Sequence, residues 1–246
     1  MRSIWTIAKR EYELYFASPV AFIAAFLILL VVGYLFYGSL VYASNQQIAL
    51  GVEVVTNPMA FMLMLITPAL TTRLLAGERS SGTVELLLTL PLREWELVLG
   101  KWLGALLFVI SILLVSLVYP VILNQFVEPG IDSGPLISGY LGLLLFSAAL
   151  IAVGILISSL FSNQIAAFLA TLFALIFLWW MFGIIGRVDL LGGGAAEISR
   201  YLDFQSHFYE NMILGILDLK DIVYYLSITV LSLFLSSIVL EIRRWR

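Results

Sequence analysis

Long apolar stretches follow one another along the chain, and short polar segments separate them. A helix of about 20 apolar residues can cross a bilayer core of about 30 Å. Helix is expected because an isolated strand cannot satisfy its backbone groups in lipid. The pattern therefore predicts six transmembrane helices in an all-α fold. The windows run approximately Val20–Tyr42, Met59–Leu75, Trp102–Leu123, Ile137–Leu160, Ile165–Ile185 and Ile222–Leu240.

A different periodicity precedes the first window. Apolar and aromatic residues recur at helical spacing between Ser3 and Phe16, and charged residues lie off their stripe. The stripe consists of Trp5, Ala8, Tyr12 and Tyr15. This pattern is typical of a helix that lies in the membrane interface and contacts lipid. We predict such a helix over residues 1–18, ended by Ser18-Pro19 because the residue before a proline disfavours helical backbone.

A charged loop, residues 77–101, separates the second and third windows. It holds a short apolar segment, Gly82–Leu90, that predicts a helix of about two turns, roughly 12 Å long. Pro91 would end this helix. Val84, Leu87 and Leu88 share one face of it. Such a face suits a docking element for a partner protein or a helix flat on the lipid headgroups, and periodicity does not choose between them.

Composition places the whole chain in a membrane. Of its 246 residues 62% are hydrophobic and 12% are charged, whereas a soluble domain carries about 25% charged residues. The net charge of −3 gives no sign of a nucleic-acid partner. Cysteine is absent and His207 is the single histidine, so a zinc or haem site is not expected. His207 itself is expected on the surface.

The distribution of basic residues predicts the orientation. If the N-terminus is cytoplasmic, ten of the 13 Lys and Arg residues fall on the cytoplasmic side, as the positive-inside rule requires. Both termini would then be cytoplasmic in a multi-pass protein of the cytoplasmic membrane. Residues 186–220 would form an extracytoplasmic loop. Its aromatic residues are expected at the headgroup level, and they include Tyr201, Phe204, Phe208 and Tyr209.

The windows offer little chemistry. Arg73, near the end of the second window, is the one ionisable Asp, Glu, Lys, Arg or His within them. Proton-driven transporters usually need titratable groups at membrane depth. The sequence also lacks the Gly-x-x-x-x-Gly-Lys-Ser/Thr loop that cradles nucleotide phosphates. We therefore expect no catalytic site and no cofactor in this chain, and any energy for transport must enter from a partner.

Two segments carry a resemblance to a known family. The charged loop reads "LAGERSSGTVELLLTLPLREWELVLGKWLG", and the chain closes with "SHFYENMILGILDLKDIVYYLSITVLSLFLSSIVLEIRRWR". Both resemble ABC-2 type permeases, the membrane subunits of ABC exporters, and most nearly their gliding-motility branch. The resemblance implies a single transmembrane domain over 1–246. It implies a cytoplasmic ABC ATPase dimer that binds ATP and Mg, and a second permease copy or paralogue. The long outside segment 186–220 suggests in addition an extracytoplasmic auxiliary protein as a partner.

The resemblance also assigns roles to residues. It implies that Thr83–Thr89 is a coupling helix seated in a groove of the ATPase, with Glu78 as a polar contact at the membrane boundary. The ATPase-coupling residues would be Glu78, Gly82, Thr83, Val84, Glu85, Leu87, Leu88 and Thr89. The function implied is an ATP-driven exporter of an unidentified substrate. The alternative is a membrane anchor that passes conformational change to an extracytoplasmic partner without moving solute.

Small residues in the fifth window point to assembly. Ala166, Ala170 and Ala174 repeat every four residues, which permits close approach of another helix. That helix could belong to the same chain. The resemblance points instead to a two-fold dimer whose contact includes the first and fifth spans.

Overall fold

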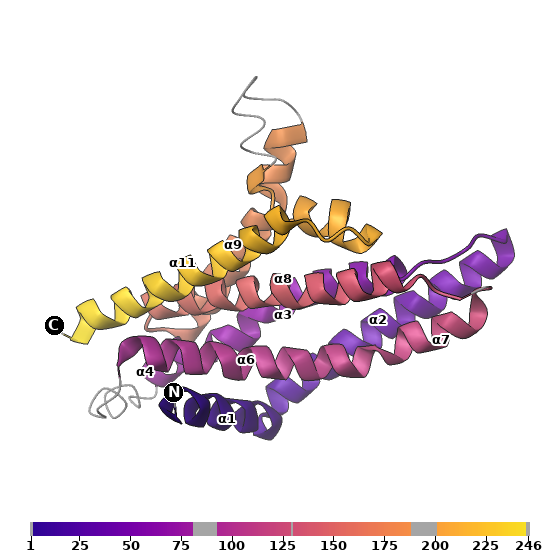
Figure 1. Ribbon diagram of the computed structural model, residues 1–246. Coiled ribbons are helices and arrows are strands. Elements are labelled where there is room, and N and C mark those ends of the chain that lie inside the picture. Colours follow the sequence, from indigo (N-terminus) through magenta and orange to yellow (C-terminus); the bar gives the residue numbers. More distant parts are fainter. Residues whose placement is uncertain (1, 81–92, 129, 188–200, 245–246) are drawn as a thin grey trace.

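The computed structural model describes residues 2–80, 93–128, 130–187 and 201–244, and all regular structure in these ranges is helical (Figure 1). The longer helices are α1 (Arg2–Ala17), α2 (Pro19–Gln46), α3 (Glu53–Thr71), α6 (Glu94–Ser116), α7 (Val118–Phe126), α8 (Ser133–Leu160), α9 (Gln164–Arg187) and α11 (Leu219–Arg244). The short ones are η1 (Arg73–Gly77), α4 (Glu78–Ser80), η2 (His207–Asn211) and η3 (Met212–Leu214).

Five helical segments in the described ranges are long and apolar enough to cross a membrane. They are Pro19–Gln46, Glu53–Ser80, Glu94–Phe126, Ser133–Leu160 and Leu219–Ile242. Each contains one predicted window, so five of the windows are confirmed as candidate spans. The remaining window, Ile165–Ile185, lies in α9, where Gln164–Trp180 forms a shorter apolar helix. The sixth span stays a prediction.

Helix α8 is the centre of the bundle. Its apolar window is 72% buried, against 28% for both α2 and α11. Glycines let neighbours approach α8 closely: a Cβ on Gly154 would lie 2.8 Å from the Cβ of Thr71, and one on Gly142 would lie 2.8 Å from Sδ of Met212. Helix α8 is therefore a packed core element, and most of the surface of α2 and α11 is left for lipid or partner protein.

The two ends of the bundle collect different parts of the chain. Figure 1 places α1, α4 and the C-terminal end of α11 at one end, and the last turns of α2 and of α7 at the other. The turn between α8 and α9 lies with α4, because Arg79 donates to the carbonyl oxygen of Ser159 at 2.7 Å. This grouping is the one that the predicted topology requires. Which end faces the cytoplasm remains a prediction.

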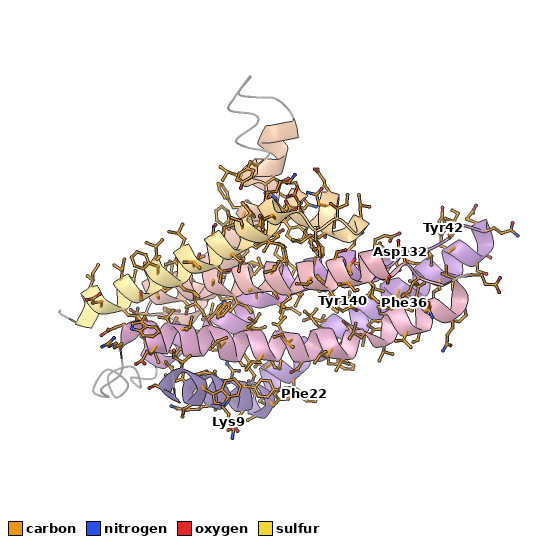
Figure 2. The ribbon with its side chains drawn as sticks, viewed as in Figure 1. Lys9, Phe22, Phe36, Tyr42, Asp132 and Tyr140 are labelled. Carbon is orange, nitrogen blue, oxygen red and sulfur yellow. The ribbon has the colours of Figure 1, made fainter. Side chains whose placement is uncertain are left out.

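The predicted break after α1 is confirmed. Ser18 has extended backbone (φ −91°, ψ 120°), and Pro19 begins α2. Lys9 points away from the bundle (Figure 2) and lies 3.9 Å from Glu13 on the exposed side of the helix. The predicted apolar stripe is only partly used for packing, since Tyr15 is fully buried but Trp5 is 61% exposed.

Helix α1 packs on α6 at unusually short range. A Cβ on Gly100 would lie 2.7 Å from the Cβ of Ile7, and one on Gly104 would lie 2.6 Å from the Cβ of Glu11. Real Cβ atoms do not approach this closely, so both positions need glycine. The pair matches the small-xxx-small spacing that lets helix backbones meet. Helix α1 is thus part of the protein core on this side, whatever its opposite side contacts.

The segment after α9 returns into the bundle. Phe204 and Phe208 are buried, with ring centroids 5.0 Å and 5.7 Å from that of Phe146 on α8. The expectation that these aromatics sit at the headgroup level is therefore wrong for both phenylalanines. Burial raises the pKa of Tyr209 to about 12. Its neutral hydroxyl donates to the carbonyl oxygen of Asn57 at 3.2 Å, which ties the segment to α3.

Candidate functional site

A lysine between two glutamates lies at the end of the bundle where the charged loop leaves and re-enters. Lys101 of α6 directs its Nζ to Oε1 of Glu11 on α1 at 2.8 Å and to Oε1 of Glu78 on α4 at 2.7 Å. We call these three residues the charged joint. The joint connects three elements that are distant in sequence.

The charged joint is buried. The side chain of Lys101 is 1% exposed, and those of Glu11 and Glu78 are 8% and 20% exposed. Removing charges from water costs several kcal/mol per ion unless each finds partners of good geometry. A lysine has three donors, and here two of them meet carboxylates at charge-assisted distance. The three side chains therefore hold one another in place and cannot separate cheaply.

A second connection lies one turn along α1. The hydroxyl of Tyr15 donates to the carbonyl oxygen of Leu70 at 2.8 Å, and burial raises the pKa of this phenol. Arg73 covers the Tyr15 ring at 4.5 Å and donates to the carbonyl oxygen of Leu14 at 3.1 Å. These contacts fasten the C-terminal turn of α1 to the end of α3.

A wide helical turn leads from α3 to α4. The segment η1 is a π-helical turn, in which each N–H bonds to the carbonyl oxygen five residues earlier. For example, the N–H of Gly77 donates to the carbonyl oxygen of Thr72 at 3.0 Å. Ser158 of α8 fits this opening: its hydroxyl accepts from the backbone of Ala76 at 3.0 Å and donates to the carbonyl oxygen of Thr72 at 3.3 Å. Such turns are frequent at functional sites. Here the turn places Glu78 against Lys101.

The joint suits the transmission of movement and shows no reaction centre. Among the described residues no group of three His, Asp or Glu side chains could hold a metal ion. The joint itself contains two carboxylates and one ammonium, without a hydroxyl or thiol nucleophile. What it can do is make α1, α4 and α6 move as one body. The flanks of segment 81–92 are fixed to that body, since α4 ends at Ser80 and α6 begins at Glu94.

The predicted site residues divide into three groups. Glu78 lies in the charged joint. The other predicted coupling residues fall in 81–92, outside the described residues: Gly82, Thr83, Val84, Glu85, Leu87, Leu88 and Thr89. The three alanines of α9 are half-buried, beside a fully buried row. They are Ala166, Ala170 and Ala174.

His207 corrects the sequence analysis. It was expected on the surface, yet only 5% of it is exposed. Its ring stacks on Tyr224 with centroids 4.0 Å apart, and its Nδ1 lies 2.6 Å from Oδ1 of Asp221. The expectation was wrong because a polar loop gave no sign that its residues return to the bundle.

Sequence reasoning also missed Lys101 and Glu11 as partners. The two are 90 residues apart, beyond any local periodicity, and a lysine at the start of an apolar helix usually extends its ammonium to the membrane surface. One signal was present. Gly100 and Gly104 flank Lys101, and a lysine between two glycines that admit another helix must find a counter-charge there.

Comparison with known proteins supplies the family. A search of the curated proteins finds no match. A family model described as "ABC-2 family transporter protein" matches residues 5–244. That range contains all three residues of the charged joint, the five candidate spans and the segment that returns after α9. The match confirms the resemblance at the level of the family, and the chain belongs to the ABC-2 family of membrane transport proteins.

Proposed function

We propose that this chain is the permease subunit of an ABC exporter, and that a separate ATPase drives it through segment 81–92. Membership of the ABC-2 family supports a permease role. The observation that carries the proposal further is the buried charged joint, which fixes both flanks of that segment to the bundle. In this proposal Thr83–Thr89 is the coupling helix and contacts the ATPase.

The joint explains how a push on segment 81–92 would reach the membrane. Glu78 lies two residues before the last residue of α4, and Lys101 lies about 12 Å along α6 from Arg93 at 1.5 Å per residue. A displacement of either flank would pull the ammonium from a carboxylate, which is costly in a buried site. The helices α1, α4 and α6 would therefore follow the ATPase together.

The proposed assembly has two ATPase subunits on the cytoplasmic side and two permeases, either two copies of this chain or a copy and a paralogue. ATP and Mg belong to the ATPase. Both termini are cytoplasmic, and an auxiliary protein would bind on the other side of the cytoplasmic membrane. Placement in the gliding-motility branch is part of the proposal and rests on the resemblance of the two quoted segments alone.

The test is a charge placed on the expected docking face. Leu87→Glu puts a carboxylate where the ATPase would bury it without a partner, at a cost of about 3 kcal/mol, roughly a hundredfold in affinity. Leu87→Met keeps the face apolar and serves as the matched control. Both variants should insert into the membrane as the parent does, and only the glutamate variant should lose the ATPase on co-purification.

The same variants separate the alternatives. If segment 81–92 only rests on headgroups, Leu87→Glu will bind the ATPase as the parent does, and the coupling proposal is wrong. A non-transporting anchor would bind the ATPase and support hydrolysis, yet reconstituted vesicles would move no solute. Glu85→Arg is the companion change, because a protein groove responds to charge reversal on the polar face far more than a headgroup layer does.

A further inference from the structure

A second buried cluster of polar residues lies where segment 201–214 meets the start of α11. Nδ1 of His207 is 2.6 Å from Oδ1 of Asp221, and Nε2 is 2.8 Å from the carbonyl oxygen of Tyr201. Asn211 donates to the other carboxylate oxygen of Asp221 at 2.8 Å. Asp221 is fully buried. Both nitrogens of the ring thus face oxygen atoms.

The two contacts of the His207 ring require two protons. The carbonyl oxygen of Tyr201 can only accept, so Nε2 must carry a proton. The contact between Nδ1 and Asp221 then needs a proton of its own, and we place it on Nδ1 because imidazole is a stronger base than a carboxylate. A neutral histidine beside an ionised aspartate has one proton too few, and one of the two short contacts would join lone pairs. Buried polar groups left in that state are costly.

The geometry points to a proton-binding site: we propose that in the folded protein the His207–Asp221 pair holds a proton in the contact between Nδ1 and the carboxylate, in addition to the proton on Nε2, and that this added proton fastens segment 201–214 to α11. The proposal is independent of the proposed transport function. It adds a ligand, the proton, at residues other than those of the charged joint.

The surroundings of the ring define what else could respond to pH. Segment 201–214 and the start of α11 contribute the titratable groups at this site, and α8, which meets the segment at Phe146 and Ser138, has no charged residue. The nearest lysine, Lys220, is half-exposed and lies 3.1 Å from Asp218. Besides His207, the titratable groups of residues 201–225 are Tyr201, Asp203, Tyr209, Glu210, Asp218, Lys220, Asp221, Tyr224 and Tyr225.

The pair has a substitution that removes the proton and keeps the bonds. In Asp221→Asn the amide can donate to Nδ1, while its oxygen still accepts from Asn211. A neutral His207 with its proton on Nε2 then satisfies every contact. Segment 201–214 should stay in place without binding a proton. Asp218→Asn is the matched control, because it makes the same change at an exposed aspartate of the same region.

The measurement uses the fact that the chain has a single histidine. The full chain, purified without a histidine tag and placed in lipid nanodiscs, is labelled with ¹⁵N-histidine and studied by NMR. A free histidine is about nine-tenths neutral at about pH 7.5. We expect the parent and Asp218→Asn to show both ring nitrogens protonated, or one tightly shared proton, at that pH. Asp221→Asn should show the neutral Nε2–H form.

A second readout links the proton to the segment. Hydrogen exchange of the amides in 207–214 should quicken at least tenfold, beyond its intrinsic pH dependence, when the parent loses the proton at higher pH. Asp221→Asn should lack this extra step, and Asp218→Asn should keep it. A parent histidine that is plainly neutral at about pH 7.5, with one nitrogen unprotonated and no shared proton, would overturn the proposal. So would an exchange step that Asp221→Asn retains.

Discussion

Lys101→Met tests whether the charged joint holds the bundle together. Methionine resembles the lysine side chain in length and flexibility, but it removes the ammonium. Glu11 and Glu78 would then face each other with their carboxylates buried and without the cation that each contacts at 2.7–2.8 Å. The change perturbs charge far more than volume.

The expected cost follows from burial. Removing one partner of a buried ion pair costs about 3–5 kcal/mol, and we take the lower end because the Glu78 side chain is 20% exposed. For chains of this size 1 kcal/mol shifts the unfolding midpoint by about 2–4 °C. Lys101→Met should therefore lower the midpoint by roughly 10 °C.

The assay is thermal unfolding in detergent, followed by tryptophan fluorescence and by retention on size-exclusion chromatography. The control is the triple variant Lys101→Met, Glu11→Gln, Glu78→Gln, which has no buried charge at the joint. Replacing a whole buried ionic group by neutral residues is often neutral. The triple variant should therefore recover most of the stability that the single variant loses.

Two outcomes would contradict this reasoning. If Lys101→Met unfolds within about 2 °C of the parent, less than the shift for 1 kcal/mol, the three charges are not coupled in the folded protein. If the single variant is unstable and the triple variant is no better, the loss comes from packing around Lys101 and not from uncompensated carboxylates.

Two further predictions concern topology and assembly. Because the chain has no cysteine, a single cysteine introduced at Ser80 or Ser44 reports on which side of the membrane that position lies. The cysteine at position 80 should react with a membrane-impermeant reagent only from the cytoplasm, and the one at position 44 only from outside. The reverse pattern would show that the predicted orientation is inverted. Ala170→Leu should weaken crosslinking between permease copies while leaving the monomer folded, since Ala170 is half-buried at the edge of the packed face of α9; a dimer of unchanged strength would place the contact elsewhere.

The features of the fold that depend on local sequence could be predicted from the hydrophobic pattern. Five apolar windows and the Ser18-Pro19 break could be read directly, because lipid selects long apolar helices and proline interrupts them. A break inside the third window was not predicted, although its cause is also local. The helix stops at Ser116 and α7 begins at Val118, because Pro120 has no N–H to bond the carbonyl of residue 116.

Long-range partners could not be predicted in the same way. Lys101 and Glu11 meet only because two glycines let α1 reach α6, and His207 meets Asp221 only because segment 201–214 turns back on α8. In each case the partner of the polar side chain lies on another element. Hydropathy assigns such residues to the surface because it scores each one without its partner.

The close contact between α1 and α6 sets an order of events during synthesis. Helix α1 emerges from the ribosome before α6, because Lys101, the partner of Glu11, follows 90 residues later, a delay of roughly 5–20 s at usual elongation rates. Through that interval α1 lacks α6, the helix on which it packs most closely, and its apolar side chains need another apolar environment. Trp5 and Phe16, which stay exposed in the folded chain, can hold the helix on the bilayer surface until Gly100 and Gly104 arrive.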